Sequence, residues 1–272
     1  MKKIFYILSL LLFFAVSCEN NNPENEGQVD TPSSLDYSSV TIAGKNAVVI
    51  KPVDSAPTAP VVVVVADDLQ LATRLTVLPE TPEVPVNFKA AEHCLVGGYI
   101  LCIVEAESDG DASFLVDVKD AFPSAPKVYL LSYCNDFAYT AAMQIPETFN
   151  AYACVSATMN VETYKNNNFT KPVSFVHVHA TENSVYKWNG VEGKSVSVPL
   201  SVGALVAINE CVTFKTTELL PREGKGRVSC THYIDSLSGC DVKLYSVEGA
   251  SNGWCDAEFE VYNQIWNFFK TH

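Results

Sequence analysis

The sequence predicts an α/β fold in which a doubly wound, mostly parallel sheet is covered by helices on both faces. Residues 61–65 are a continuous run of valines, and residues 99–104 are almost entirely apolar. Such runs are typical of strands buried on both faces of a parallel sheet. Helical patterns separate them along the chain, and this alternation favours an open, helix-covered sheet. Ligands of such sheets bind beyond the carboxyl ends of the strands.

The other predicted elements continue this alternation of strands and helices. Helical patterns cover 87–95 and 112–122, before and after the second strand. Two further apolar strands are predicted at 128–131 and 173–178. The chain ends with a predicted strand at 242–247 and an amphipathic helix at 257–270.

Residues 1–18 are predicted to be an export signal and not part of the fold. Lys2 and Lys3 precede an apolar run at 4–16 that is too short to span a membrane. The ending Ala-Val-Ser-Cys18 resembles a bacterial lipoprotein signal, which implies lipidation of Cys18. The alternative is an ordinary signal peptide with an incidental cysteine. We therefore expect an exported protein anchored by lipid to a bacterial membrane, at the periplasmic or surface face of the outer membrane.

Residues 19–35 are expected to be a flexible tether, because this polar segment offers no apolar residue able to pack. Residues 36–272 are long enough for one domain with a large core, and no repeat or second linker divides them. The formal net charge is −13. So acidic a protein repels nucleic acid and anionic lipid headgroups, which leaves neutral ligands as the better fit.

Eight cysteines besides Cys18 make some disulfides expected in an exported protein. None of their spacings is that of a CxxC or zinc-finger motif, and we expect neither a zinc site nor a cofactor. Asp67, Asp68 and Asp136 leave a calcium site as an alternative to a solvated acidic loop. The absence of EF-hand spacing favours the loop.

Residues 127–137, KVYLLSYCNDF, are predicted to pass from a strand into a helix through a sharp turn. A GxSxG nucleophile elbow has this context, with small residues beside a nucleophile on a strained turn. The five positions here read Ser132, Tyr133, Cys134, Asn135 and Asp136. The context of the elbow is present, but cysteine replaces its serine and both glycines are missing.

Five segments, in the required order, resemble secreted α/β-hydrolases of the polyhydroxybutyrate depolymerase and feruloyl esterase group. Residues 128–142 resemble the family's elbow and helix, 177–183 its HGTxD segment, and 242–254 its final strand and EGGGHxW turn; the segments 198–211 and 265–269 also fit. The resemblance implies an α/β-hydrolase fold. It also implies which residues stand at the family's functional positions: Cys134 at the nucleophile, Asn183 at the acid, Asn252 at the base, and Ala66 and Asp67 in the oxyanion loop.

These substitutions make the implied chemistry doubtful. Asn252 has no titratable nitrogen, so it cannot take a proton from the nucleophile, and Asn183 cannot carry the charge that stabilises an imidazolium. A carboxylate in the oxyanion loop would repel a developing oxyanion. His179 ends a predicted strand and is the candidate substitute base, although it matches a structural histidine of the family.

Three interpretations follow from the resemblance. The leading one is a binding or accessory protein for glycans or their esters with an impaired catalytic site. The alternative is a carboxylic-ester hydrolase, such as a feruloyl or acetyl esterase or a polyhydroxybutyrate depolymerase, with Cys134 as nucleophile. The third is a shifted alignment in which another serine acts.

The resemblance also implies a disulfide between Cys211 and Cys240, since both match positions where the family commonly has cysteine. The chain-entropy model gives such a bond about 3–4 kcal/mol of stabilisation. Two free thiols are the alternative.

Overall fold

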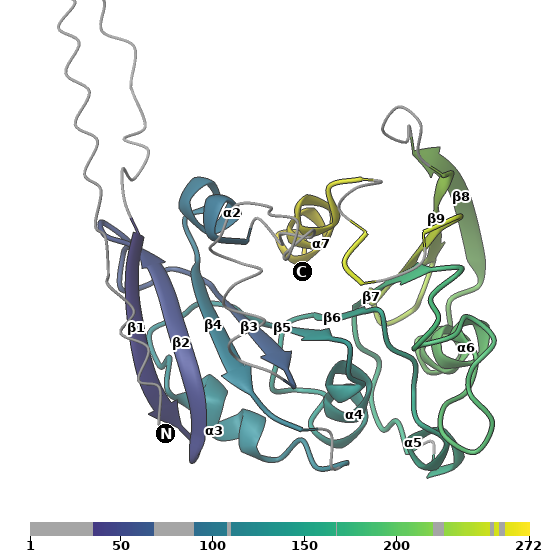
Figure 1. Ribbon diagram of the computed structural model, residues 1–272, viewed down its shortest axis with the longest axis horizontal. Helices are drawn as coiled ribbons and strands as arrows, with labels where there is room; N and C mark the ends of the chain where they lie inside the picture. The colour runs from purple at the N-terminus through teal and green to yellow at the C-terminus, as the bar shows by residue number, and fades with distance from the viewer. Residues whose placement is uncertain are drawn as a thin grey trace, which may run out of the picture. The chain divides into compact units, whose positions relative to one another are not determined.

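The predicted architecture is confirmed by a computed structural model that describes residues 35–67, 90–107, 110–166, 168–219, 226–250, 253–255 and 259–272. These residues belong to one unit, Thr31–His272, and form a 10-stranded sheet with helices on both faces (Figure 1). The export signal with Cys18, the tether to residue 34, Asp68 and Asn252 lie outside the described residues.

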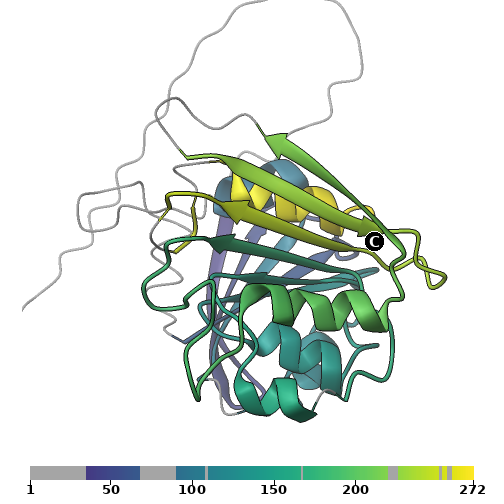
Figure 2. The same cartoon turned by 90° about the vertical axis from the view of Figure 1, so that its right-hand side faces the viewer.

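The strands run in the spatial order β1-β2-β4-β3-β5-β6-β7-β10-β9-β8. The six central strands, from β4 to β10, are parallel, and an antiparallel hairpin extends the sheet at each edge (Figure 2). The strands are β1 (Leu35–Ile42), β2 (Lys45–Pro52), β3 (Val61–Ala66), β4 (Ile100–Glu105), β5 (Val128–Tyr133), β6 (Tyr152–Val155), β7 (Phe175–Ala180), β8 (Thr213–Leu219), β9 (Val228–Ile234) and β10 (Val242–Val247).

Two hydrophobic layers hold the helices on the sheet. Successive side chains of a strand point to opposite faces. In β3, therefore, Val62 and Val64 pack in one layer, and Val61, Val63 and Val65 in the other. The first layer carries α2 and α7, and the second carries α3, α4 and α6 (Figure 1). The helices are α2 (Ala90–Gly97), α3 (Phe114–Asp120), α4 (Phe137–Gln144), α5 (Val161–Asn166), α6 (Val198–Ile208) and α7 (Val261–Phe269).

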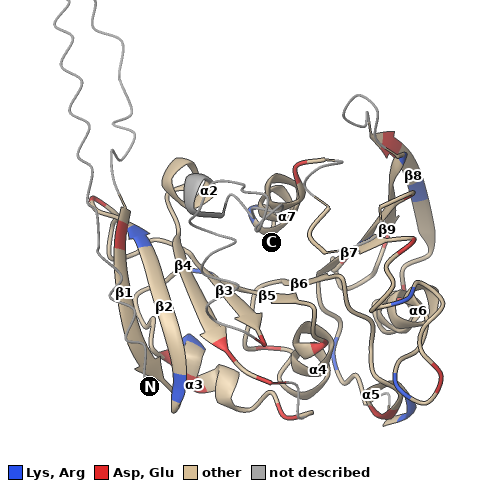
Figure 3. Ribbon diagram, in the orientation of Figure 1, with Lys and Arg blue, Asp and Glu red and all other residues tan. Residues whose placement is uncertain are grey.

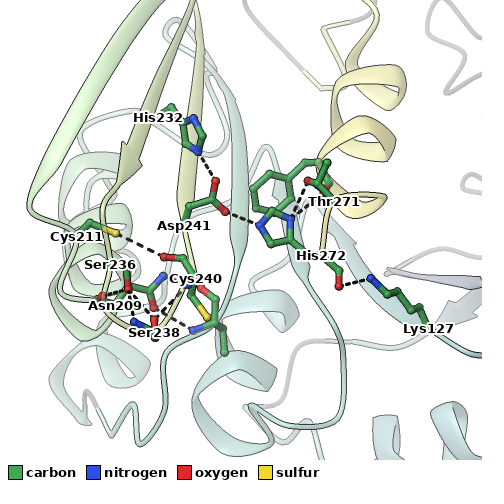
Figure 4. A network of polar contacts seen from close by, with 12 residues as sticks. Lys127, Asn209, Cys211, His232, Ser236, Ser238, Cys240, Asp241, Thr271 and His272 are labelled. Atoms are coloured by element: carbon green, nitrogen blue, oxygen red, sulfur yellow. Dashed lines mark hydrogen bonds and ion pairs between the residues drawn. The ribbon is translucent and has the colours of Figure 1, made fainter.

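The closing helix α7 is fixed by aromatic contacts and by polar contacts at its end. Phe269 stacks on Tyr129 of β5 at 4.7 Å between ring centroids. Beyond the helix, His272 Nε2 lies 2.7 Å from Asp241 Oδ1, and Asp241 Oδ2 also contacts His232 (Figure 4). This histidine–aspartate–histidine network ties the end of α7 to β9 and to the residue before β10.

The predicted Cys211–Cys240 disulfide is absent from the structure: all eight cysteines from Cys94 to Cys255 are described, and none of them is joined to another by a disulfide. The Cys211 Sγ lies 3.9 Å from the backbone carbonyl oxygen of Cys240 (Figure 4). The two segments are thus neighbours, as the resemblance implied, but the Cys211 thiol meets the main chain of its neighbour.

Candidate functional site

The predicted elbow is present between β5 and α4. Cys134 occupies this turn with a φ of +58°, in the left-handed region that L residues other than glycine rarely adopt. Its backbone N–H donates to the Val155 carbonyl oxygen at 3.0 Å. Such a conformation costs on the order of 1–3 kcal/mol and persists only where the surroundings enforce it. Cys134 therefore has the strained backbone expected of an elbow nucleophile.

Asn135 and Asp136 join the elbow to neighbouring elements. The Asn135 Nδ2 group donates to the Val65 carbonyl oxygen of β3 at 3.1 Å. The buried Asp136 Oδ2 accepts from the Asn160 backbone N–H at 3.1 Å and from its side-chain amide at 2.8 Å. These bonds fix the turn against β3 and against the start of α5.

A cavity of about 390 Å³ opens beside the elbow, beyond the carboxyl ends of β3, β5 and β6 where the fold predicts a ligand site. Figure 3 shows acidic residues after β3 and at the start of α4, on this side of the sheet. The lining includes Asp67, Cys134, Asp136, Thr158, Asn160, Val185, Tyr186 and Lys194.

Thr158 contributes a buried hydroxyl that has no hydrogen-bond partner among the described residues. The residue is only 3% exposed, and it lines the cavity. Buried polar groups nearly always find a partner, because leaving one unpaired costs about 1–3 kcal/mol. The hydroxyl oxygen is sealed from solvent, so a ligand with hydroxyl or carbonyl groups in the cavity would pair with it only after the Thr158 side chain rotates.

The Cys134 thiol is held in its neutral form. Burial raises its pKa to about 12; a hydrogen bond from the Tyr133 hydroxyl lowers it, and the nearby Asp67 carboxylate raises it. Only the thiolate is strongly nucleophilic. At neutral pH, a pKa near 12 leaves a fraction of about 10⁻⁵ in that form.

Tyr133 also contacts the loop after β10, where the family carries its base. Its ring packs edge-on against Trp254, with centroids 5.7 Å apart. A Cβ at Gly253 would lie 3.1 Å from the Tyr133 hydroxyl oxygen, so this loop needs a glycine there. Tyr133 thus contacts both the thiol and this loop. Asn252, the residue predicted at the base position, lies outside the described residues.

Asn183, at the family's acid position, acts as a turn cap. Its Oδ1 accepts from the backbone N–H groups of Val185 at 3.0 Å and Tyr186 at 2.9 Å. The Tyr186 hydroxyl in turn donates to the Cys134 carbonyl oxygen. Asn183 therefore positions the Tyr186 ring over the elbow, and neither bond needs a charge on its side chain.

His179 is not placed to act as a base, because both of its ring nitrogens are engaged. Its Nε2 lies 2.6 Å from the Tyr186 carbonyl oxygen, which can only accept, so Nε2 carries the proton. Its Nδ1 then accepts from His177 Nε2 at 3.2 Å, and His177 Nδ1 accepts from the Tyr139 hydroxyl at 2.7 Å. Each group thus donates to the next, from the Tyr139 hydroxyl through the two histidines to the Tyr186 carbonyl oxygen, and no ring nitrogen is left to take a proton.

Burial keeps both histidines neutral. It lowers the pKa of His179 to about 4 and that of His177 well below its ordinary value. Neither histidine lines the cavity. The pair therefore supports the loop that carries Tyr186, which agrees with the structural role implied by the resemblance.

Ala66, at the predicted oxyanion-loop position, is a buried residue of the central sheet. This residue ends β3 in the core, and its carbonyl oxygen accepts from Ala106 N–H at 3.1 Å. Asp67 follows at the cavity. Desolvation raises the pKa of its carboxyl group, and the negative charges of Glu107 and Asp136 raise it further, while a hydrogen bond with Asn135 lowers it. A carboxylate at this place disfavours an oxyanion.

Neither a metal site nor a membrane span is found in the part of the chain that the structure describes. No three histidine, cysteine or acidic side chains within it are grouped so as to hold a metal ion. No helix within it has both the length and the apolar character needed to cross a bilayer.

Thr158, Asn160 and Tyr186 are among the cavity residues that the sequence-based prediction missed. Thr158 follows an apolar strand and carries no motif, and Tyr186 reaches the elbow only because the loop after β7 turns back. For Asn160 a local signal exists, because an asparagine just before a helix is typical of an N-cap. Its Oδ1 accepts from the Thr163 N–H of α5 at 2.7 Å.

The sequence matches no protein-family model and no curated protein. Solved structures with a similar fold do exist. A Bacteroides ovatus protein assigned by name as a dipeptidyl aminopeptidase IV gives a TM-score of 0.52 at 10% identity, over 88% of this chain and 36% of that one. A prolyl endopeptidase gives 0.50 at 9%, over 87% and 37%. A glucuronoyl esterase from Solibacter usitatus gives 0.49 at 12%, over 90% and 87%.

The chain thus spans about a third of the two peptidase chains and most of the esterase chain. At identities of 9–12%, such likeness establishes the fold and not the reaction. Together with the strand order and the strained turn at Cys134, the likeness to the two peptidases shows that this chain has an α/β-hydrolase-like fold.

Proposed function

We propose that the protein binds a neutral, hydroxyl-rich ligand, a glycan or a glycan ester, in the cavity beside the elbow and releases it unchanged. The observation that carries this proposal is a cavity lined by Thr158, whose buried hydroxyl has no partner among the described residues, and by Cys134, whose thiol is kept protonated by burial. The first feature calls for a hydrogen-bonding ligand, and the second argues against covalent attack on it.

The remaining lining supports a carbohydrate-like ligand. Binding cavities for small molecules combine apolar surface with a few placed polar groups. Here Tyr186 and Val185 provide apolar surface, while Asn160 and Thr158 provide hydrogen-bonding groups. Aromatic rings such as that of Tyr186 bind molecules with one apolar and one polar side. The lining carries one cation, Lys194, and two carboxylates, Asp67 and Asp136, the second of which is bonded to Asn160, so it offers no excess of positive charge to an anionic ligand.

Ester hydrolysis by Cys134 is the second candidate, and one observation favours it. The residue keeps a left-handed backbone at a place where such strain is commonly associated with function. The reaction would need a base to take the thiol proton, and the described histidines of β7 are engaged elsewhere. Loss of one triad member typically lowers turnover by about 10⁴ to 10⁶.

One set of variants tests binding. The chain after the signal is screened for binding to neutral glycans and acetylated or feruloylated glycans, as wild type, Thr158→Val and Thr140→Val. Thr140 is the matched control, because its hydroxyl is also buried and unpaired among the described residues but does not line the cavity. We expect Thr158→Val to weaken binding about tenfold, the worth of one hydrogen bond. Equal binding by all three proteins would refute the proposed site.

Turnover separates the two candidates. Acetyl, feruloyl and hydroxybutyrate esters are incubated with wild type and Cys134→Ala. The binding proposal expects no release of acid above the background of the variant. Release by wild type that is lost in Cys134→Ala would establish the hydrolase instead.

We also propose that the domain is tethered to a bacterial membrane through lipid on Cys18, at the periplasmic or surface face of the outer membrane. The support is the lipoprotein-like ending of the apolar segment and the polar composition that follows it. Mass spectrometry of the membrane-bound protein tests this proposal. A diacylated amino-terminal Cys18 is expected, and a Cys18→Ser variant should leave the membrane fraction. An unmodified wild-type cysteine would contradict it.

A further inference from the structure

A second cavity of about 440 Å³ lies next to the elbow cavity and shares two of its lining residues, Asn160 and Lys194. Between the two, the main chains are bridged: Asn160 pairs with Ser195, and the Val161 N–H donates to the Lys194 carbonyl oxygen at 2.9 Å. The two cavities therefore adjoin at Asn160 and Lys194, and these hydrogen bonds form a short ridge of paired backbone there.

The walls of this second cavity are held in place by their own hydrogen bonds. Gln144, the last residue of α4, donates through Nε2 to the Gly110 carbonyl oxygen at 2.8 Å and accepts from the Ala112 N–H at 3.0 Å. Asn160 caps Thr163 on the opposite side. A preformed cavity binds with a smaller loss of conformational entropy than one that must be ordered by its ligand.

The lining again favours a neutral, hydroxyl-rich molecule. Met143 supplies the apolar surface, and Gln144, Asn166 and Thr163 supply polar groups. Its charged lining residues, Glu162 and Lys194, are of opposite sign, and Glu162 also forms an exposed ion pair with Lys165 at 3.2 Å. Each cavity falls within the size range of ordinary small-molecule sites, roughly 300–1,000 Å³.

We propose that the two cavities are successive subsites for one oligosaccharide chain, which crosses the ridge formed by Asn160 and Lys194. This inference rests on the proposed function and makes it more specific, since the ligand is then a polymer segment of several sugar units and not a single sugar or a small ester. The elbow cavity holds one end of the segment, and the cavity beside α5 holds the other.

The test uses xylo-, manno- and gluco-oligosaccharide ladders of one to six units with the chain after the signal. Affinity is measured by calorimetry for wild type, Asn166→Trp and Asn168→Trp. Asn166 lines the second cavity only, where a tryptophan would fill the space; Asn168 lies two residues further on, exposed and outside both cavities. We expect affinity for one ladder to rise about tenfold once the chain is long enough to reach both cavities. Asn166→Trp should lose that gain, and Asn168→Trp should keep it.

Thr158→Val tests the elbow cavity separately, since Thr158 lines that cavity only. It should weaken binding of every length by a similar factor. Affinity that does not change with length, or a gain that survives Asn166→Trp, would overturn the two-subsite inference while leaving the proposed function intact. Failure of all three ladders and of the glycan screen would overturn the proposed function, and the inference with it.

Discussion

The buried histidine pair on β7 makes the stability of the protein depend on pH, and the size of the effect follows from the structure. The pKa of His179 is about 4 in the fold and 6.5 in the unfolded chain. The unfolded chain therefore binds the additional proton between these values, and protonation favours unfolding. Stability from this group is complete above pH 6.5 and falls as the pH is lowered toward 4.

The magnitude is set by the difference between the two pKa values. Each unit corresponds to about 1.4 kcal/mol, so relative to neutral pH His179 alone costs about 2 kcal/mol at pH 5 and about 3 kcal/mol at pH 4, with a limit of about 3.4 kcal/mol at lower pH. His177 acts in the same direction, because its pKa is lowered as well.

Urea unfolding between pH 7.5 and 4.5 measures this effect. Wild type is compared with His179→Gln, which cannot titrate but keeps an amide to bond the Tyr186 carbonyl oxygen, and with His93→Gln as a control outside the chain of hydrogen bonds. We expect the free energy of unfolding of His179→Gln to fall less steeply with acid, by about one proton's slope. Equal slopes for all three proteins would refute the assignment of His179 as a buried, neutral residue.

Three further perturbations test the supports of the site. Gly253→Ala should destabilise the protein by about 1 kcal/mol more than Gly193→Ala in urea unfolding, because both glycines have a positive φ but only the first would place its Cβ against a tyrosine hydroxyl; equal effects would contradict the contact. Asn183→Ala should cost about 1–2 kcal/mol and Asn183→Asp much less, since an aspartate keeps the acceptor for both backbone N–H groups; equal losses in the two variants would argue against a capping role. Desolvation lowers the pKa of His272, but its bonds to the Asp241 carboxylate and to a backbone carbonyl outweigh this effect and raise it. Asp241→Asn should therefore lower the pKa of His272 in an NMR titration, and it should remove the stability that wild type loses as the pH rises through the raised pKa. An unshifted titration would contradict the pairing.

The elements of the fold that are buried on both faces were predictable from the sequence, because their signal is local. The valine run of β3 and the strand at Val242–Val247 lie where the apolar patterns predict them. The edge hairpins were not predicted: β8 is almost wholly exposed, so its sequence TFKTTEL lacks a run of apolar residues. Its pairing with β9 depends on backbone hydrogen bonds that no side-chain pattern records.

The site was predictable only in part, for a similar reason. The position of Cys134 follows from a local strand-to-helix turn, and the structure confirms that turn. The roles of Asn183 and Tyr186 depend on where the loop after β7 closes, which no short segment encodes. The Cys211–Cys240 bond was inferred from family positions, and those positions fix the proximity of two segments but not the direction of their sulfur atoms.

The central claim is that Cys134 sits in a ligand cavity as a neutral thiol and not as a nucleophile. Its rate of alkylation by iodoacetamide, followed by peptide mass spectrometry from pH 6 to 10, tests this most directly. With a pKa of about 12, the thiolate fraction at pH 7 is about 3,000-fold below that of an ordinary cysteine, and the rate should rise about tenfold per pH unit throughout the range. A rate that matches an ordinary cysteine's at pH 7 and levels off below pH 9 would contradict the claim and identify Cys134 as an activated nucleophile.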